Sequence, residues 1–117
     1  MRNFLLLVCA LAIAAGAWGA QKKVTLTGIL IDKACSKDPK TVPAKHDKDC
    51  ALMDDCLKSG YGVVTADGKF TPFDTMGSKT ALGWLNSTKA KSNLKVIVTG
   101  TTDGGVMKVE SIEGPVK

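Results

Sequence analysis

The sequence predicts a mainly β (α+β) fold: a small five-stranded barrel with one or two short helices, placed after an N-terminal signal peptide. Three observations predict it. Five segments carry strand-like patterns, helical segments interrupt them, and a glycine stands in the middle of the first strand. An open five-stranded sheet with one helix packed on it is the alternative.

The first 20 residues have the three-part layout of a secretory signal peptide. Residues 1–3 are positive, residues 4–15 are apolar, and residues 16–20 are mostly small. The apolar run is shorter than the roughly 20 residues that a helix needs to cross a bilayer. We therefore expect a cut between residues 17 and 20, with an uncleaved anchor as the alternative. The mature chain is expected to be exported, periplasmic or extracellular, without stable membrane insertion, and to form a single domain over 21–117.

The first half of that domain contains one strand and one helix. A strand is expected over 24–32, where alternating apolar residues give way to an end that is apolar on both faces. Gly28 in its middle predicts a bulge or a sharp bend. A polar loop is expected over 33–48. A helix is then expected over 50–58, with Asp49 as its cap.

The next segments predict a hairpin and a second helix. Strands are expected over 61–65 and 69–73, because Asp67 and Gly68 between them form a strong turn signal. A short helix is expected over 79–85, which turns apolar residues toward the core.

The last segments predict a second hairpin and complete the strand order. Strands are expected over 94–101 and 106–112, with a bulge or a strand end near Ser111, where the alternation of apolar residues changes phase. Five strands with a glycine bend in the first and a helix before the fourth are typical of a small barrel of the OB type.

The chain resembles a group of small exported bacterial OB-like β-barrel proteins that carry a Cys/His cluster. The resemblance covers most of the mature chain. It implies an OB-like fold and a Cys/His cluster, and it brings no established reaction. It rests on Gly28 with Asp32-Lys33-Ala34-Cys35, His46 with Cys50-Ala51, Gly60-Tyr61-Gly62-Val63-Val64, Val98-Thr99-Gly100-Thr101 and Val109-Glu110-Ser111-Ile112.

One segment is chemically distinctive, because Cys35, His46, Cys50 and Cys56 lie close together in the sequence and His46 is the only histidine. Thiolate and imidazole are the ligands that zinc and copper take in proteins. We therefore expect a zinc or copper ion on Cys35, His46 and Cys50. Cys56 is a weaker fourth candidate, because on one continuous helix it would point about 240° away from Cys50. It can join only if that helix frays or breaks.

Two other interpretations of the cysteines stay open. A disulfide could join Cys35 to Cys50 or Cys56 and leave one spare thiol. The stapled OB-like module would then bind a peptide, a glycan or another partner in the cell envelope. A thiol-redox protein is the third interpretation, although the chain has no CxxC pair and four aspartates near the cysteines oppose thiolate formation.

Composition argues against other classes of function. The only arginine, Arg2, leaves with the signal peptide, so the remaining basic side chains are all lysine, and they are spread along the chain. Four aromatic residues remain, too few for the stacking platforms of single-strand binders, and we expect no nucleic-acid partner. No complete set of catalytic residues is present. The leading prediction is a non-enzymatic binding module of open oligomeric state, with a metal ion or an envelope partner as its ligand.

Overall fold

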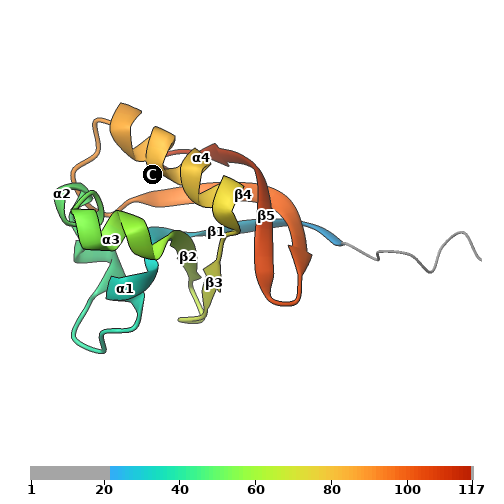
Figure 1. The fold of residues 1–117 in the computed structure, drawn as a ribbon, viewed down its shortest axis with the longest axis horizontal. Helices are drawn as coiled ribbons and strands as arrows, with labels where there is room; N and C mark the ends of the chain where they lie inside the picture. Colours follow the sequence, from blue (N-terminus) through green and yellow to red (C-terminus); the bar gives the residue numbers. More distant parts are fainter. Residues whose placement is uncertain (1–21, 117) are drawn as a thin grey trace, which may run out of the picture.

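The computed structural model describes residues 22–116, and one five-stranded antiparallel sheet forms its centre (Figure 1). The strands lie in the order β3-β2-β1-β4-β5, which confirms the mainly β prediction. The predicted signal peptide lies outside the described residues. The strands are β1 (Lys22–Asp32), β2 (Tyr61–Thr65), β3 (Phe70–Pro72), β4 (Lys95–Asp103) and β5 (Val106–Glu113). The helices are α1 (Lys33–Ser36), the 3-10 turn η1 (Pro43–Lys45), α2 (Lys48–Ala51), α3 (Asp54–Ser59) and α4 (Thr75–Ser87).

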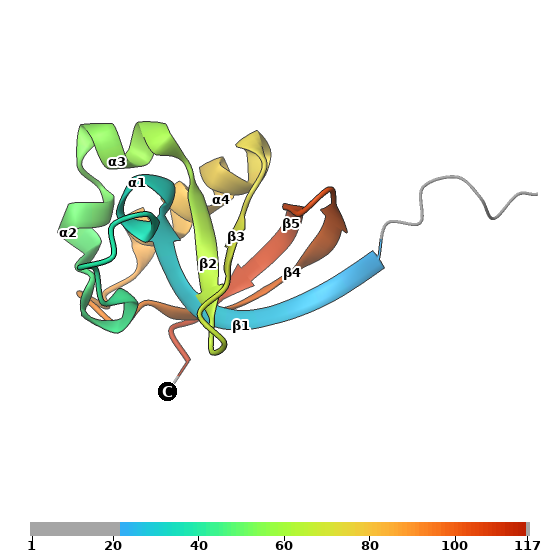
Figure 2. The ribbon, with the colours of Figure 1, turned by 90° about the horizontal axis from the view of Figure 1, so that it is seen from below.

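Strand β1 belongs to both halves of the sheet. Most of its length pairs with β4, and its last residues pair with β2. Gly28 takes part in both ladders, opposite Val96 on one side and Thr65 on the other. A Cβ atom at Gly28 would lie 2.3 Å from the carbonyl oxygen of Val64, so no side chain fits there. The strand curves strongly along its course without a register shift in either ladder, which makes the predicted irregularity a bend (Figure 2).

The second hairpin contains the predicted bulge. Thr99 of β4 faces Ser111 of β5, but the next residue, Gly100, already faces Val109. Glu110 is therefore the extra residue on β5. A bulge of this kind lets apolar residues before and after it reach the same side of the strand.

Helix α4 covers the sheet and closes the hydrophobic core (Figure 1). It is longer than the predicted helix because Asp74 caps it, with Oδ1 accepting a hydrogen bond from the Gly77 backbone N–H at 2.7 Å. Its buried residues face β5 and β2. The core cluster consists of Leu30, Ala51, Tyr61, Val63, Phe73, Ala81, Leu85, Leu94, Val96, Val98 and Met107.

In the part of the chain that the structure describes, the two edges of the sheet approach each other at one point only. Just after β3, Phe73 forms a single parallel bridge with Met107 of β5, and the Asp74 N–H donates to the Met107 carbonyl oxygen at 3.0 Å. One bridge is not a ladder, so within residues 22–116 the sheet is open, and the prediction of a closed barrel is not shown.

The short helices α1, α2 and α3 gather at one end of the sheet, where β1 ends and β2 begins (Figure 2). This helical end holds all four residues that the sequence proposed as metal ligands. Among the described residues, the structure contains no helix with the length and apolar character required to cross a membrane.

Candidate metal centre

The turn from β1 into α1 positions Cys35. The sequence predicted a polar loop from residue 33, but the structure has a short helix there, and that part of the prediction was wrong. Asp32, the last residue of β1, caps this helix: its Oδ2 accepts a hydrogen bond from the Cys35 backbone N–H at 2.9 Å. The cap supplies a partner for an N–H group that the helix itself cannot satisfy, and so the helix forms directly at the strand end.

His46 follows η1 and turns inward. Its ring is buried, with 7% of the residue exposed, and its Nε2 lies 2.8 Å from Oδ1 of Asp32, whose own exposure is 0%. A polar ring and a carboxylate can share a buried site because each supplies the other's hydrogen bond. This pair fixes the orientation of the imidazole.

The predicted helix over 50–58 is wrong as one element, because it is broken into α2 and α3. Met53 lies between them in an extended conformation and is the N-cap of α3. Helix α2 begins at Lys48, so the predicted cap Asp49 lies inside its first turn. Asp54 and Asp55 begin the new helix, where acidic residues interact favourably with the helix dipole. The break removes the constraint that would have kept Cys50 and Cys56 on different faces of one helix.

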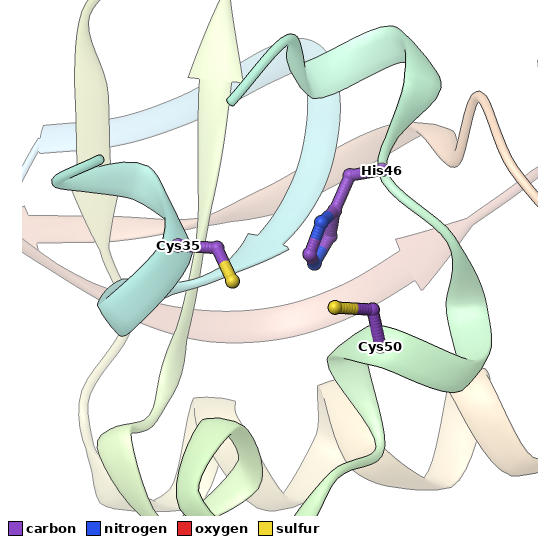
Figure 3. A group of neighbouring side chains, drawn as sticks. All are labelled: Cys35, His46 and Cys50. Carbon is purple, nitrogen blue, oxygen red and sulfur yellow. The ribbon is translucent and has the colours of Figure 1, made fainter. Parts of the chain in front are cut away.

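Three of the four predicted ligands converge. One ligand atom each from Cys35, His46 and Cys50 lies within 4.8 Å of the other two. Figure 3 shows the two thiols pointing toward each other, beside the tip of the imidazole ring, from three separate segments of the chain. Two thiols and an imidazole could hold a zinc or copper ion.

Cys56 belongs to a second, overlapping group. Its sulfur lies within 4.8 Å of ligand atoms of Cys35 and Asp32, whereas it is not part of the group formed with His46 and Cys50. Cys35 is therefore common to both groups. Of the four predicted ligands, Cys35, His46 and Cys50 form one group, and Cys56 lies beside Cys35 outside it.

The disulfide interpretation is not what the structure shows. Cys35, Cys50 and Cys56 are free thiols, so within residues 22–116 no pair is at bonding distance. A disulfide requires the two sulfurs at about 2.05 Å, with Cβ atoms directed to match. The disulfide predicted from Cys35 to Cys50 or Cys56 is therefore wrong for this structure, in which the three thiols are neighbours without a bond.

Burial and a neighbouring negative charge keep two of these thiols protonated. Burial raises the pKa of Cys35, and the neighbouring carboxylate of Asp32 raises it further. Burial and the same carboxylate raise the pKa of Cys56. A redox thiol needs a lowered pKa, so these shifts argue against the thiol-redox interpretation. A metal ion would displace the protons as it binds, because thiolate is the binding form.

Asp32 itself stays ionised. Burial opposes its charge, but the hydrogen bonds from His46 and from the Cys35 N–H outweigh burial and hold its pKa below the usual value. Sequence reasoning missed this residue and looked instead to the acids near the cysteines. Those acids, Asp47, Asp49, Asp54 and Asp55, are exposed. The signal that could have found Asp32 is an aspartate at a strand end, three residues before a cysteine.

Tyr61 connects the core to the helical end. Its ring is buried in the core, and its hydroxyl donates to the Ala51 carbonyl oxygen of α2 at 2.6 Å. Burial raises its pKa to about 12, and the nearby carboxylate of Asp32 adds to this effect. The hydroxyl is therefore a neutral donor that holds the end of α2, one residue from Cys50, against β2.

Two surface hollows reach the candidate ligands. One, of about 270 Å³, has Cys35 in its wall, and another, of about 300 Å³, is lined by His46 together with Lys40 and Lys45. Each hollow borders one of the two types of ligand residue.

Comparison with known proteins leaves the chain without an assigned family. No protein family, no curated protein and no solved structure matches it. The resemblance to small exported OB-like proteins therefore stays a prediction.

Proposed function

We propose that this protein is an exported, non-enzymatic binding protein for a soft or borderline metal ion, zinc or copper, held by Cys35, His46 and Cys50. The observation that carries the proposal is the convergence of these three side chains from three separate segments within 4.8 Å. Two sulfurs and an imidazole nitrogen form a soft to borderline donor set, which favours zinc or copper over hard cations.

The spacing suits a metal after a small contraction. Zinc binds sulfur at about 2.3 Å and imidazole nitrogen at about 2.0 Å, which places neighbouring tetrahedral ligands roughly 3.5 to 3.8 Å apart. The three ligand atoms lie at most 4.8 Å apart, so each pair needs to approach by no more than about one ångström to reach this spacing. Rotation of a thiol side chain covers such a distance without movement of the sheet.

Cellular location and finer fold belong to the same proposal. The signal-like sequence of residues 1–20 supports export to the periplasm or the extracellular space. The bridge between Phe73 and Met107 supports an OB-like barrel that is nearly closed, because it brings β5 beside the end of β3. The absence of arginine from residues 21–117 and their scattered lysines support a ligand other than nucleic acid.

The test is reconstitution of the reduced protein with Zn²⁺ and, separately, with Cu⁺, followed by native mass spectrometry and competition with a chelator. We expect one bound ion. Removal of a ligand in Cys35→Ser, Cys50→Ser or His46→Gln should weaken binding by more than the about 10- to 100-fold typical of a residue that only supports a ligand.

Cys56→Ser is the matched control, because it removes a thiol of similar burial that lies outside the three-ligand group. It should weaken binding less than the other serine variants. Equal losses in all three serine variants would contradict the three-ligand set, and a wild-type protein that takes up neither ion would contradict the proposed function.

A further inference from the structure

Asp32 connects two of the three candidate ligands through one carboxylate. Oδ1 lies 2.8 Å from the Nε2 of His46, and Oδ2 lies 2.9 Å from the backbone nitrogen of Cys35. The residue is completely buried. A buried carboxylate is costly unless its oxygens are paired, and here each oxygen is paired with a different ligand residue.

The hydrogen bond from the Cys35 backbone N–H to Oδ2 of Asp32 positions the backbone at Cys35. Helix α1 has only 4 residues, and a helix of that length is not stable by itself. Its first turn depends on the cap that Asp32 provides. The capped group is the backbone N–H of Cys35, so the cap also fixes the backbone position from which the Cys35 side chain extends.

The contact between Nε2 of His46 and Oδ1 of Asp32 orients the imidazole ring. This residue follows a 3-residue turn and has no regular helix or strand to orient it. Where the Asp32 carboxylate accepts this bond, Nε2 of His46 is the donor, and Nδ1 is the ring nitrogen left for a metal ion. The bond therefore defines both the ring orientation and the protonated nitrogen in the metal-free protein.

The same carboxylate also belongs to a second group, with Cys35 and Cys56, whose ligand atoms lie within 4.8 Å of one another. Each oxygen of Asp32 already accepts a bond from a ligand residue of the first group. A metal ion on Asp32 would compete with the contacts that assemble Cys35 and His46.

We propose that Asp32 is the positioning residue of the centre: it brings the Cys35 thiol and the His46 ring together before a metal ion arrives. This role rests on the function proposed above. Carboxylates that accept a hydrogen bond from a ligating histidine act in this way in many metal sites.

Asp74 provides a matched comparison within the chain. It also caps a helix, with Oδ1 2.7 Å from the Gly77 backbone nitrogen, but it is less buried and caps the 13-residue helix α4 far from the cysteines in the sequence. Substitution of either aspartate removes a charged cap. Only substitution of Asp32 also removes the partner of a histidine.

The experiment uses the reduced full-length protein with ¹⁵N-labelled histidine, as wild type, Asp32→Asn, Asp32→Ala and Asp74→Asn. In the metal-free wild type and in Asp74→Asn, NMR should show a proton on Nε2 of His46 in a single ring environment. Asp32→Ala should lose that environment. The Zn²⁺ affinity should fall about 10- to 100-fold in Asp32→Asn, further in Asp32→Ala, and not in Asp74→Asn.

A wild-type ring without a proton on Nε2, or equal Zn²⁺ affinity in Asp32→Asn and Asp74→Asn, would overturn the positioning role. The nearly isosteric Asp32→Asn carries the test if Asp32→Ala does not fold. The ring measurement needs no metal. If the wild type binds no Zn²⁺, the proposed function fails, while the ring signals still decide whether Asp32 holds His46.

Discussion

The two ends of the molecule are built on different principles. Around α4, apolar side chains from four strands and one long helix fill a continuous core. At the other end, α1, α2 and α3 have 4 to 6 residues each, and polar contacts such as the Asp32 cap add to the packing of Ala51, Leu52 and Leu57 on the core. Burial of apolar surface stabilises the first region wherever the pattern is right, whereas the second depends on particular atoms meeting.

The difference suggests that the core provides stability and the helical end provides the binding site. We expect the core to carry most of the stability and the short helices to adjust slightly when an ion binds. Regions with few buried apolar contacts are the ones that open locally at low free-energy cost. The following variants break or sharpen this comparison.

The largest effect is expected from Leu85→Ala. Leu85 lies on the inner face of α4 with 0% exposure, so the substitution leaves a cavity in the core. Unfolding free energy should fall by about 2 to 5 kcal/mol, as measured by urea denaturation. Met76→Ala on the exposed side of the same helix should change it little, because 65% of Met76 is exposed. A large loss of Zn²⁺ affinity in folded Leu85→Ala would argue against separate roles for the two regions.

A smaller effect is expected from Tyr61→Phe, which keeps the ring in the core but removes the hydroxyl that donates to Ala51. The Ala51 carbonyl oxygen loses its side-chain donor, so stability should fall by about 1 kcal/mol. Hydrogen exchange should show faster opening of α2, and Zn²⁺ should bind more weakly, because Cys50 belongs to that helix. Uniformly faster exchange in β4 and β5 instead would contradict a local connection.

The smallest effect is expected in the pH dependence of the unfolding free energy, to which ionisation of Asp32 contributes at acid pH. Its pKa is lowered in the folded protein, so its ionised form stabilises the fold above the unfolded pKa near 4. That contribution is lost as the pH falls through the folded pKa. In metal-free protein, Asp32→Asn should therefore flatten the decline of unfolding free energy below about pH 4. Asp67→Asn is the control: its pKa is also lowered, but it is fully exposed. An identical effect in both variants would contradict a special role for the buried carboxylate.

The strands could be predicted from the sequence because their signals are local. Alternating apolar residues and the Asp67-Gly68 turn place both hairpins near their observed bounds, and Gly28 marks a real bend. The start of α4 was missed because the capping signal of Asp74 was not used and Gly77 weakens the helical pattern.

The candidate site could be predicted only as a set of residue types. Leu52 and Met53 are good helix formers, so nothing local announces the break between α2 and α3. The break accompanies tertiary contacts, such as the Tyr61 hydroxyl on Ala51 and the Lys48 N–H on the Lys91 carbonyl oxygen at 2.7 Å. Asp32 was missed for a related reason, because its burial depends on where His46 arrives.

The double pairing of β1 has a consequence for the order of assembly. Every residue of the cluster lies between positions 32 and 56, whereas the ladder between β1 and β4 joins segments from opposite ends of the described chain. Contacts between near neighbours in sequence form faster than those that close a long loop. The sulfur-bearing segment precedes β4 in the chain, so we expect its local contacts to form before the ladder between β1 and β4 closes.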